Sequence, residues 1–279
     1  MRIGLRSVAA VVALSVGLSA VAQITIYHGS GSETAAMTLS PWGNGTIAET
    51  KDVAKDGANS IKVVTRGLYQ GGIMSLKTPV DLKPSAADPN FLLDIQVAMA
   101  EGSSGGTSDT SPFPKQLRIV IAFDDGKMTE IYFPVYRSYH TAGRWHGYAV
   151  PVCKIPKFAD SSGKLSAIGF YADIPATMYV GNIAVVNDST PLNGEIYSQY
   201  TNIGREDEIP FAVSADAGDT QLKFYWDWDD KDGVQKDSEG PFVWHRFRNP
   251  GEYTVTLTIE DAFGVKKSFS TTVKITVNP

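Results

Sequence analysis

The chain contains 279 residues, with 25 basic and 30 acidic side chains and a formal net charge of −5. A hydrophobic content of 43% with 20% charged residues is typical of a globular protein and excludes an intrinsically disordered one. Phosphate groups require basic patches, so an acidic chain without runs of Lys and Arg argues against nucleic-acid binding. The single cysteine, Cys153, excludes an internal disulfide and a cysteine-based zinc cluster.

The first 22 residues have the three parts of a secretory signal peptide. Arg2 and Arg6 form a basic start, residues 7–18 form an uncharged apolar run, and a small-x-small cleavage site ends at Ala22. Among the 257 residues that remain after cleavage, no apolar run approaches the roughly 20 residues needed to span a bilayer. We therefore expect an exported protein, secreted or associated with the cell surface, that is not inserted in the membrane after signal removal.

Short apolar or β-branched segments separated by turn residues follow the signal peptide. No stretch of twelve or more residues keeps a helical period of 3.6. The Asp125-Gly126 dipeptide predicts a hairpin with a type I′ turn, which requires positive φ at both central residues. Many short strands joined by turns predict an all-β fold, with a jelly-roll β-sandwich in this part of the chain. The expected strands are 24–28, 61–65, 72–78, 91–99, 117–123, 129–135, 145–152, 165–171 and 177–186.

The segment 187–191 has the composition of a linker. The charge distribution changes at this point: residues 191–279 carry 9 basic and 15 acidic side chains, a net charge of −6, whereas residues 23–190 carry only −1. The sequence therefore predicts two domains after the signal peptide (1–22), namely 23–190 and 191–279.

The C-terminal region contains three motifs in a characteristic order. The strand-like segment LKFYWDW ends at Trp228, PFVWHRF spans residues 241–247, and NPGEYTVTLTIEDAFG spans residues 249–264. In this order the motifs resemble the PKD domain, an immunoglobulin-like β-sandwich of seven strands, over residues 191–279. The resemblance implies a spacer, adhesion module or accessory binder rather than a catalyst. The departure from the family is the turn after Trp228, which reads DDKDG where Gly-Asp-Gly is usual.

Acidic residues in that turn invite a calcium interpretation. Asp227, Asp229, Asp230 and Asp232 have the alternate spacing with which carboxylates converge on a hard cation, although no Glu stands at the twelfth position of a calcium loop. In the alternative interpretation, Asp227 or Asp229 accepts hydrogen bonds from nearby backbone N–H groups in a solvated turn. Asp188, near the last strand of the first domain, is a second candidate ligand for a structural calcium ion, and no other cofactor is expected.

The tryptophans of the same region also have two interpretations. Trp226, Trp228 and Trp244 could form a sugar platform, but a sandwich of this size needs aromatic filling. We therefore expect them to pack in the core.

Residues 23–190 resemble the galactose-binding-like jelly rolls that are common among carbohydrate-binding modules. The resemblance is carried by GANSIKV at 57–63, GRWHGYAVP at 143–151, GKLSAIGFY at 163–171 and YVGNI at 179–183. It implies a jelly-roll fold and a polysaccharide or glycan ligand.

Sugars bind through aromatic faces that cover their C–H surfaces, flanked by groups that hydrogen-bond hydroxyls. One segment and two loops offer both kinds of group, although Trp145 could instead cover the core. The candidate ligand-binding residues are Tyr136, Tyr139, His140, Arg144, Trp145, Trp42 and Tyr69.

These observations predict a monomeric, non-catalytic protein of two modules that binds extracellular or cell-surface polysaccharide. An alternative is a structural or adhesive component of the cell envelope that acts through contacts with cell-surface proteins. A further alternative is a polysaccharide lyase-like enzyme, because Tyr139, His140, Arg144 and His146 are residue types that neutralise a uronate and move a proton.

Overall fold

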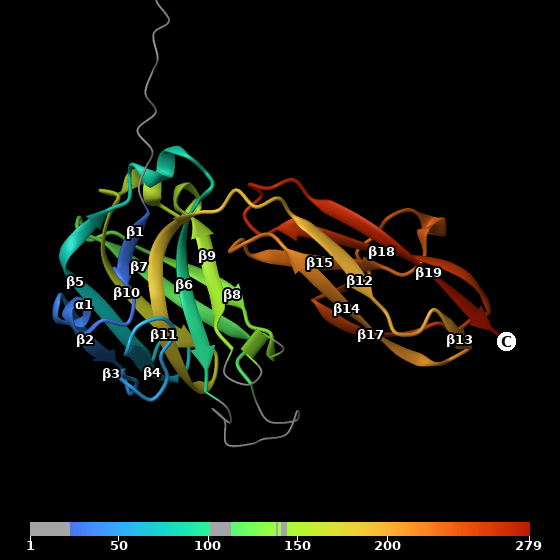
Figure 1. Cartoon of the computed structure of the whole chain (residues 1–279), viewed down its shortest axis with the longest axis horizontal. Coiled ribbons are helices and arrows are strands. Elements are labelled where there is room, and N and C mark those ends of the chain that lie inside the picture. The colour runs from blue at the N-terminus through green and yellow to red at the C-terminus, as the bar shows by residue number, and fades with distance from the viewer. Residues whose placement is uncertain (1–22, 101–112, 138, 141–143) are drawn as a thin grey trace, which may run out of the picture.

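The computed structural model describes residues 23–100, 113–137, 139–140 and 144–279, and these residues form an all-β protein with two sandwiches (Figure 1). The all-β prediction is confirmed. Neighbouring strands in the first sandwich pair antiparallel. One of its sheets contains β3 (Thr46–Thr50), β4 (Ser60–Arg66), β11 (Pro175–Asn187), β6 (Phe91–Met99) and β9 (His146–Pro151), with β1 (Ile24–Tyr27) also paired to β11. The other contains β2 (Met37–Trp42), β5 (Gly71–Asp81), β10 (Lys164–Ala172), β7 (Gln116–Phe123) and β8 (Met128–Pro134).

Strand alternation places the core between these two sheets. In β7, Leu117, Ile119 and Ile121 are fully buried, whereas Arg118 lies on the opposite side of the strand. Side chains alternate across a strand, so each sheet has one apolar inner face and one outer face. In strand β6 the side chains are buried at every position, on the outer face as well as on the inner face.

The predicted hairpin joins β7 and β8, but its turn is of a different type. Of the two residues expected at the centre of the turn, Gly126 has a positive φ of 81° and Asp125 does not have a positive φ. Gly126 N donates to Phe123 O, and Phe123 N donates to Lys127 O. These bonds form a type I turn followed by a left-handed glycine, which is the three-residue hairpin loop rather than type I′.

A short helix, α1 (Gly31–Ala35), was not expected. Ser30 accepts a bond from the first turn, and the Glu33 carboxylate accepts a bond from the Ser30 backbone N–H, which forms a capping box. Short 3₁₀ segments in the described part of the chain include Ser85–Ala87 (η1), Val152–Lys154 (η3), Phe158–Asp160 (η4) and Asp230–Asp232 (η5).

The second sandwich begins after the segment 188–192. One sheet contains β12 (Asn193–Tyr197), β14 (Glu208–Asp216) and β17 (Phe242–Arg246). The other contains β13 (Asn202–Gly204), β19 (Phe269–Asn278), β18 (Gly251–Asp261), β15 (Leu222–Asp227) and β16 (Ser238–Glu239), and β13 pairs parallel to β19. No strand is shared between sheets before Asn187 and those after Asn193 (Figure 1).

The core of the second sandwich is aromatic, as expected for two of its three tryptophans. Trp226 is fully buried, stacks on Trp228 with ring centroids 5.6 Å apart, and donates its indole N–H to Gly240 O over 2.9 Å. The packing expectation is wrong for Trp244, which is 56% exposed. Trp244 lies on the outward side of β17, where its neighbours along the strand, Val243 and His245, point inward.

Among the described residues, the helices are all too short or too polar to cross a membrane.

Candidate functional site

The predicted ligand-binding residues do not form one site. Trp42 and Tyr69 are exposed at one edge of the first sandwich, on the outer side of the sheet that contains β2 and β5. Arg144 is exposed, and Trp145 lies against Gly181 of β11, whose missing Cβ leaves room for the indole ring. The remaining three, Tyr136, Tyr139 and His140, belong to an aromatic cluster near the second sandwich.

That cluster is a packed group of rings. The rings of Tyr139 and His146 stack with centroids 4.4 Å apart, and His140 Nε2 lies 2.7 Å from the Tyr148 hydroxyl. His140 is only 4% exposed. Burial lowers the pKa of His140 and of His146 to about 4, so both rings are neutral near pH 7.

Tyr136, Tyr139 and His146 also face the second sandwich. They form one wall of a cavity of about 220 Å³ whose opposite wall includes Ala217 and Gln221. Close to it, the Gln221 side chain donates to Gly147 O over 2.7 Å. The structure therefore places these predicted binding residues at the junction of the two sandwiches.

A different group of residues lies across the outer face of the sheet β2-β5-β10-β7-β8. Cross-strand partners point to the same side of a sheet, so the register identifies its rows. Trp42 pairs with Gly71, Tyr171 lies beside Gly71, and Arg118 pairs with both Tyr171 and Tyr132. With five strands, this row spans about 19 Å at roughly 4.8 Å per strand.

The next row on the same face is made mostly of small and apolar residues. Together with the first row and Tyr69, it forms what we call the Arg118 face. The residues of this second row are Ser40, Ile73, Gly169, Val120 and Glu130.

The Arg118 guanidinium makes cation–π contacts with two aromatic rings. Its guanidinium carbon lies 4.7 Å from the centroid of the Tyr69 ring and 4.7 Å from that of Tyr171. Beneath this stack, Gly169 is required: an added Cβ would come within 2.9 Å of the Tyr171 ring. Cation–π contact and close packing therefore fix the three side chains as a unit.

The edge of the same guanidinium is bonded to a carboxylate. Arg118 donates from Nη2 to Glu130 Oε1 over 2.7 Å and from Nε to Oε2 over 3.0 Å, and Nη1 donates to Leu68 O over 2.8 Å. Tyr132 donates its hydroxyl to Glu130 Oε2 over 2.7 Å. The hydrogen bonds from Arg118 and Tyr132 lower the pKa of Glu130 to about 2, so this carboxylate stays ionised near neutral pH.

Three aromatic residues of the Arg118 face are open to solvent: Tyr69 is 64% exposed, Trp42 53% and Tyr132 42%. Trp42 and Tyr69 are among the ligand-binding residues predicted from the sequence, whereas Arg118, Glu130, Tyr132 and Tyr171 are not. The available signal was Arg118 itself, a single charge inside the apolar strand QLRIVIAF.

The acidic turn of the second sandwich is organised by its own backbone. Asp227 is buried and accepts bonds from the N–H groups of Asp229 and Gln235, and Asp229 accepts one from Lys231. This matches the backbone-bonding interpretation of the turn. Asp232 is exposed, and the side chain of Asp230 lies outside the described part of the structure. Among the described side chains, no group of three or more His, Cys, Asp or Glu is placed to hold a metal ion.

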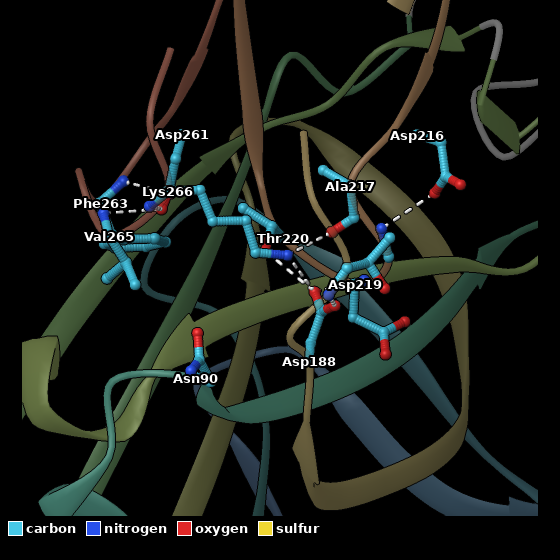
Figure 2. Close-up of polar contacts among 12 residues, drawn as sticks. Asn90, Asp188, Asp216, Ala217, Asp219, Thr220, Asp261, Phe263, Val265 and Lys266 are labelled. Carbon is cyan, nitrogen blue, oxygen red and sulfur yellow. Dashed lines mark hydrogen bonds and ion pairs between the residues drawn. The ribbon is translucent and has the colours of Figure 1, made fainter. Parts of the chain in front are cut away.

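Asp188, the other predicted calcium ligand, has a lysine as its cationic partner. Figure 2 shows its carboxylate facing the Lys266 ammonium, with Nζ 2.8 Å from Oδ2. The backbone N–H of Asp219 and the Thr220 hydroxyl each donate to Oδ2 over 3.0 Å, and the backbone N–H of Thr190 donates to Oδ1. Protein donors thus satisfy this buried carboxylate.

Comparison with known proteins identifies one of the two sandwiches. Residues 195–277 match the family model described as the PKD domain. The second sandwich is a PKD domain. No curated protein matches the chain closely enough to count as a relative.

Several solved structures resemble the chain. A β-1,2-glucanase from Parabacteroides distasonis is 17% identical, with a TM-score of 0.35, over 88% of this chain and 37% of its own. The chain therefore spans little more than a third of that enzyme's length. A carbohydrate-binding module of the β-sandwich superfamily is 14% identical over 54% of this chain and 57% of its own, with a TM-score of 0.33. The PKD domain of the human receptor SorCS2 is 22% identical over 32% of this chain and 76% of its own, with a TM-score of 0.25.

Proposed function

We propose that this protein is a secreted, non-catalytic binder of extracellular polysaccharide, and that the Arg118 face is its binding surface. The observation that carries the proposal is the stack of Tyr69, Arg118 and Tyr171, with its outermost ring open to solvent. A ring already held in place binds a sugar with little loss of conformational freedom.

The other groups on the face complement this ring. Trp42 and Tyr132 stand in the row that Arg118 and Tyr171 occupy, so apolar ring surface recurs along it. Glu130 presents a carboxylate, which accepts hydrogen bonds from hydroxyl groups. Aromatic surface with a few placed polar groups is the combination that sugar recognition requires.

The same geometry supports a binding role rather than hydrolysis. A glycosidase needs two facing carboxyl groups, roughly 5 to 9.5 Å apart, and one of them must be protonated to act as an acid. In the two described rows of the Arg118 face, Glu130 is the only carboxyl group, and its pKa of about 2 suits a permanent counter-ion.

Affinity electrophoresis of residues 23–279 in gels containing soluble polysaccharides tests the proposal. We expect retardation by at least one polysaccharide, and Tyr69→Ala or Trp42→Ala should weaken the affinity by about tenfold or more, the range of an aromatic anchor in an interface. The matched control is Tyr197→Ala, which removes a tyrosine of similar exposure (65%) from the PKD domain.

Two results would contradict the proposal. One is the absence of retardation across a broad panel of neutral and acidic polysaccharides. The other is an equal loss of affinity in the Tyr69→Ala and Tyr197→Ala variants, with thermal unfolding unchanged in both.

A second candidate function, an adhesive component of the cell envelope, is favoured by a surface of the PKD domain. On the outer side of the sheet β12-β14-β17, Tyr197 and Phe242 lie in one row and Trp244 in an adjacent row, and all three are about half exposed or more. Sizing chromatography separates the candidates: an adhesive component would self-associate and lose association in a Trp244→Ala variant, whereas a polysaccharide binder would remain monomeric.

A further inference from the structure

The charged groups of the Arg118 face are paired with each other. The two rows described above contain one cation, Arg118, and one anion, Glu130. A third row on the same side, made of Thr38, Ser75, Ala167, Ala122 and Met128, has no charged residue. These described rows therefore present a surface with a net charge of zero.

Arg118 has little capacity left for a ligand. A guanidinium binds a carboxylate or sulfate best through two parallel N–H bonds along one edge. In this structure Nε and Nη2 already make such a pair of bonds to Glu130, Nη1 donates to Leu68 O, and the Tyr69 and Tyr171 rings both contact the guanidinium. The side chain is also buried, with 9% of it exposed.

Glu130 is different, because 41% of its side chain remains exposed. Its oxygens accept bonds from Arg118 and Tyr132, and a carboxylate has about four lone-pair positions in total. Three of these positions are used, and the one that remains, on Oε1, suits a hydroxyl donor, whereas the negative charge repels a second carboxylate.

Building on the proposed function, we infer that the Arg118 face selects neutral, hydroxyl-rich polysaccharides and rejects polyuronates and sulfated glycans. Glu130 is the specificity-determining residue. It pairs with Arg118, the one cation of the face, which an acidic sugar would need as its own partner. Arg118 is a positioning residue, because it holds the 67–70 loop through Leu68 O and the Tyr69 ring through stacking.

The test compares residues 23–279 in gels containing neutral polysaccharides (mixed-linkage β-glucan, xyloglucan, galactomannan) with gels containing polygalacturonate, alginate or chondroitin sulfate. We expect the wild-type protein to bind the best neutral polymer at least about tenfold more tightly than any acidic one. Glu130→Gln keeps the side-chain shape but leaves Arg118 with a net charge. This variant should gain affinity for the acidic polymers, and sodium chloride should remove the gain.

A matched control removes the same charge elsewhere. Glu260→Gln breaks a 3.1 Å ion pair with Lys236 in the PKD domain, so it changes the net charge equally without touching the Arg118 face. It should not change the preference between polymers. Thermal unfolding of each variant confirms that it is folded.

The inference is overturned, with the proposed function intact, if wild type binds an acidic polymer more tightly than every neutral one and Tyr69→Ala abolishes this binding. It is also overturned if Glu130→Gln and Glu260→Gln change binding of acidic polymers equally. If no polymer of either class retards the protein and Tyr69→Ala has no effect, the proposed function itself fails.

Discussion

The ammonium group of Lys266 donates a hydrogen bond to Asp188 Oδ2 over 2.8 Å, although the two residues are 78 positions apart in the sequence. Asp188 directly follows the last strand of the first sandwich, and Lys266 precedes the last strand of the PKD domain. Lys266 also donates to Ala217 O over 2.7 Å, so one ammonium group joins the linker to two loops of the PKD domain (Figure 2). Burial alone would raise the pKa of Asp188, but the bonds from Lys266, Thr190 and Thr220 outweigh it and lower that pKa.

Replacing Lys266 with methionine should therefore be strongly destabilising. The change leaves the Asp188 carboxylate buried without its cation, which costs about 3–5 kcal/mol for a buried pair. Lys236→Met is the matched control: Lys236 is exposed and pairs with Glu260, and such surface pairs contribute about 0–1 kcal/mol. Urea unfolding followed by tryptophan fluorescence measures both. Equal losses of unfolding free energy would show that the Asp188–Lys266 pair adds nothing to stability.

Asp94 should make the protein less stable as the pH rises through neutrality. This residue of β6 is buried, Gln96 donates to its Oδ2 over 2.8 Å, and its Oδ1 has no hydrogen-bond partner among the described residues. Burial, with a smaller contribution from Asp219, raises the pKa of Asp94 to about 7. A raised carboxyl pKa gives stability that is complete below about pH 4 and lost as the pH rises through 7.

The substitution Asp94→Asn should abolish that part of the pH dependence. The variant should be more stable than wild type at pH 8 and close to it at pH 5, as judged by thermal unfolding midpoints. Asp160→Asn, on an exposed residue, is the control. A wild-type midpoint that does not fall relative to Asp94→Asn between pH 5 and pH 8 would contradict the assignment.

His245 should have the opposite effect at acid pH. Its ring stacks on that of Trp228 with centroids 4.0 Å apart, and burial lowers the pKa of His245 to about 4. A lowered histidine pKa gives stability that is present above about pH 6.5 and lost as the pH falls toward 4. His245→Phe should reduce this acid destabilisation, whereas substituting the exposed His28 with Gln should leave it unchanged. The measurement is the unfolding midpoint at pH 7, 5.5 and 4.5, and parallel curves for wild type and His245→Phe would count against the prediction.

Trp226 is buried and Trp244 is exposed, so replacing each with phenylalanine should change the free energy of unfolding by different amounts. Trp226→Phe removes a donor from the buried Gly240 carbonyl and leaves a space in the core, so it should cost about 1–3 kcal/mol or more. Trp244→Phe changes an exposed side chain and should cost less than about 0.5 kcal/mol. Chemical denaturation, followed by circular dichroism because the fluorophores change, compares them. Similar costs would show that the two sites are equivalent in the folded protein.

Local patterns were sufficient for much of the fold. The apolar run at 91–99 coincides with β6, and the Asp125-Gly126 dipeptide marks a real hairpin. The Ser30–Glu33 capping box was also readable and would have predicted α1. The orientation of Trp244 was not accessible in this way, because alternation separates the two sides of a strand without saying which side faces the core.

The sequence by itself determined the β-strand architecture, since strand alternation, turn glycines and capping residues act over a few positions. The residues of the predicted binding segment nevertheless lie in different places: Tyr136, Tyr139 and His140 are at the junction of the sandwiches, and Arg144 is exposed to solvent. Only the tertiary structure placed Tyr69, Arg118, Glu130 and Tyr171 together and joined Asp188 to Lys266. The contact of Arg118 with Tyr171 depends on the register between β7 and β10, and the Asp188–Lys266 pair depends on how the loops of two sandwiches meet, so no local pattern determines either.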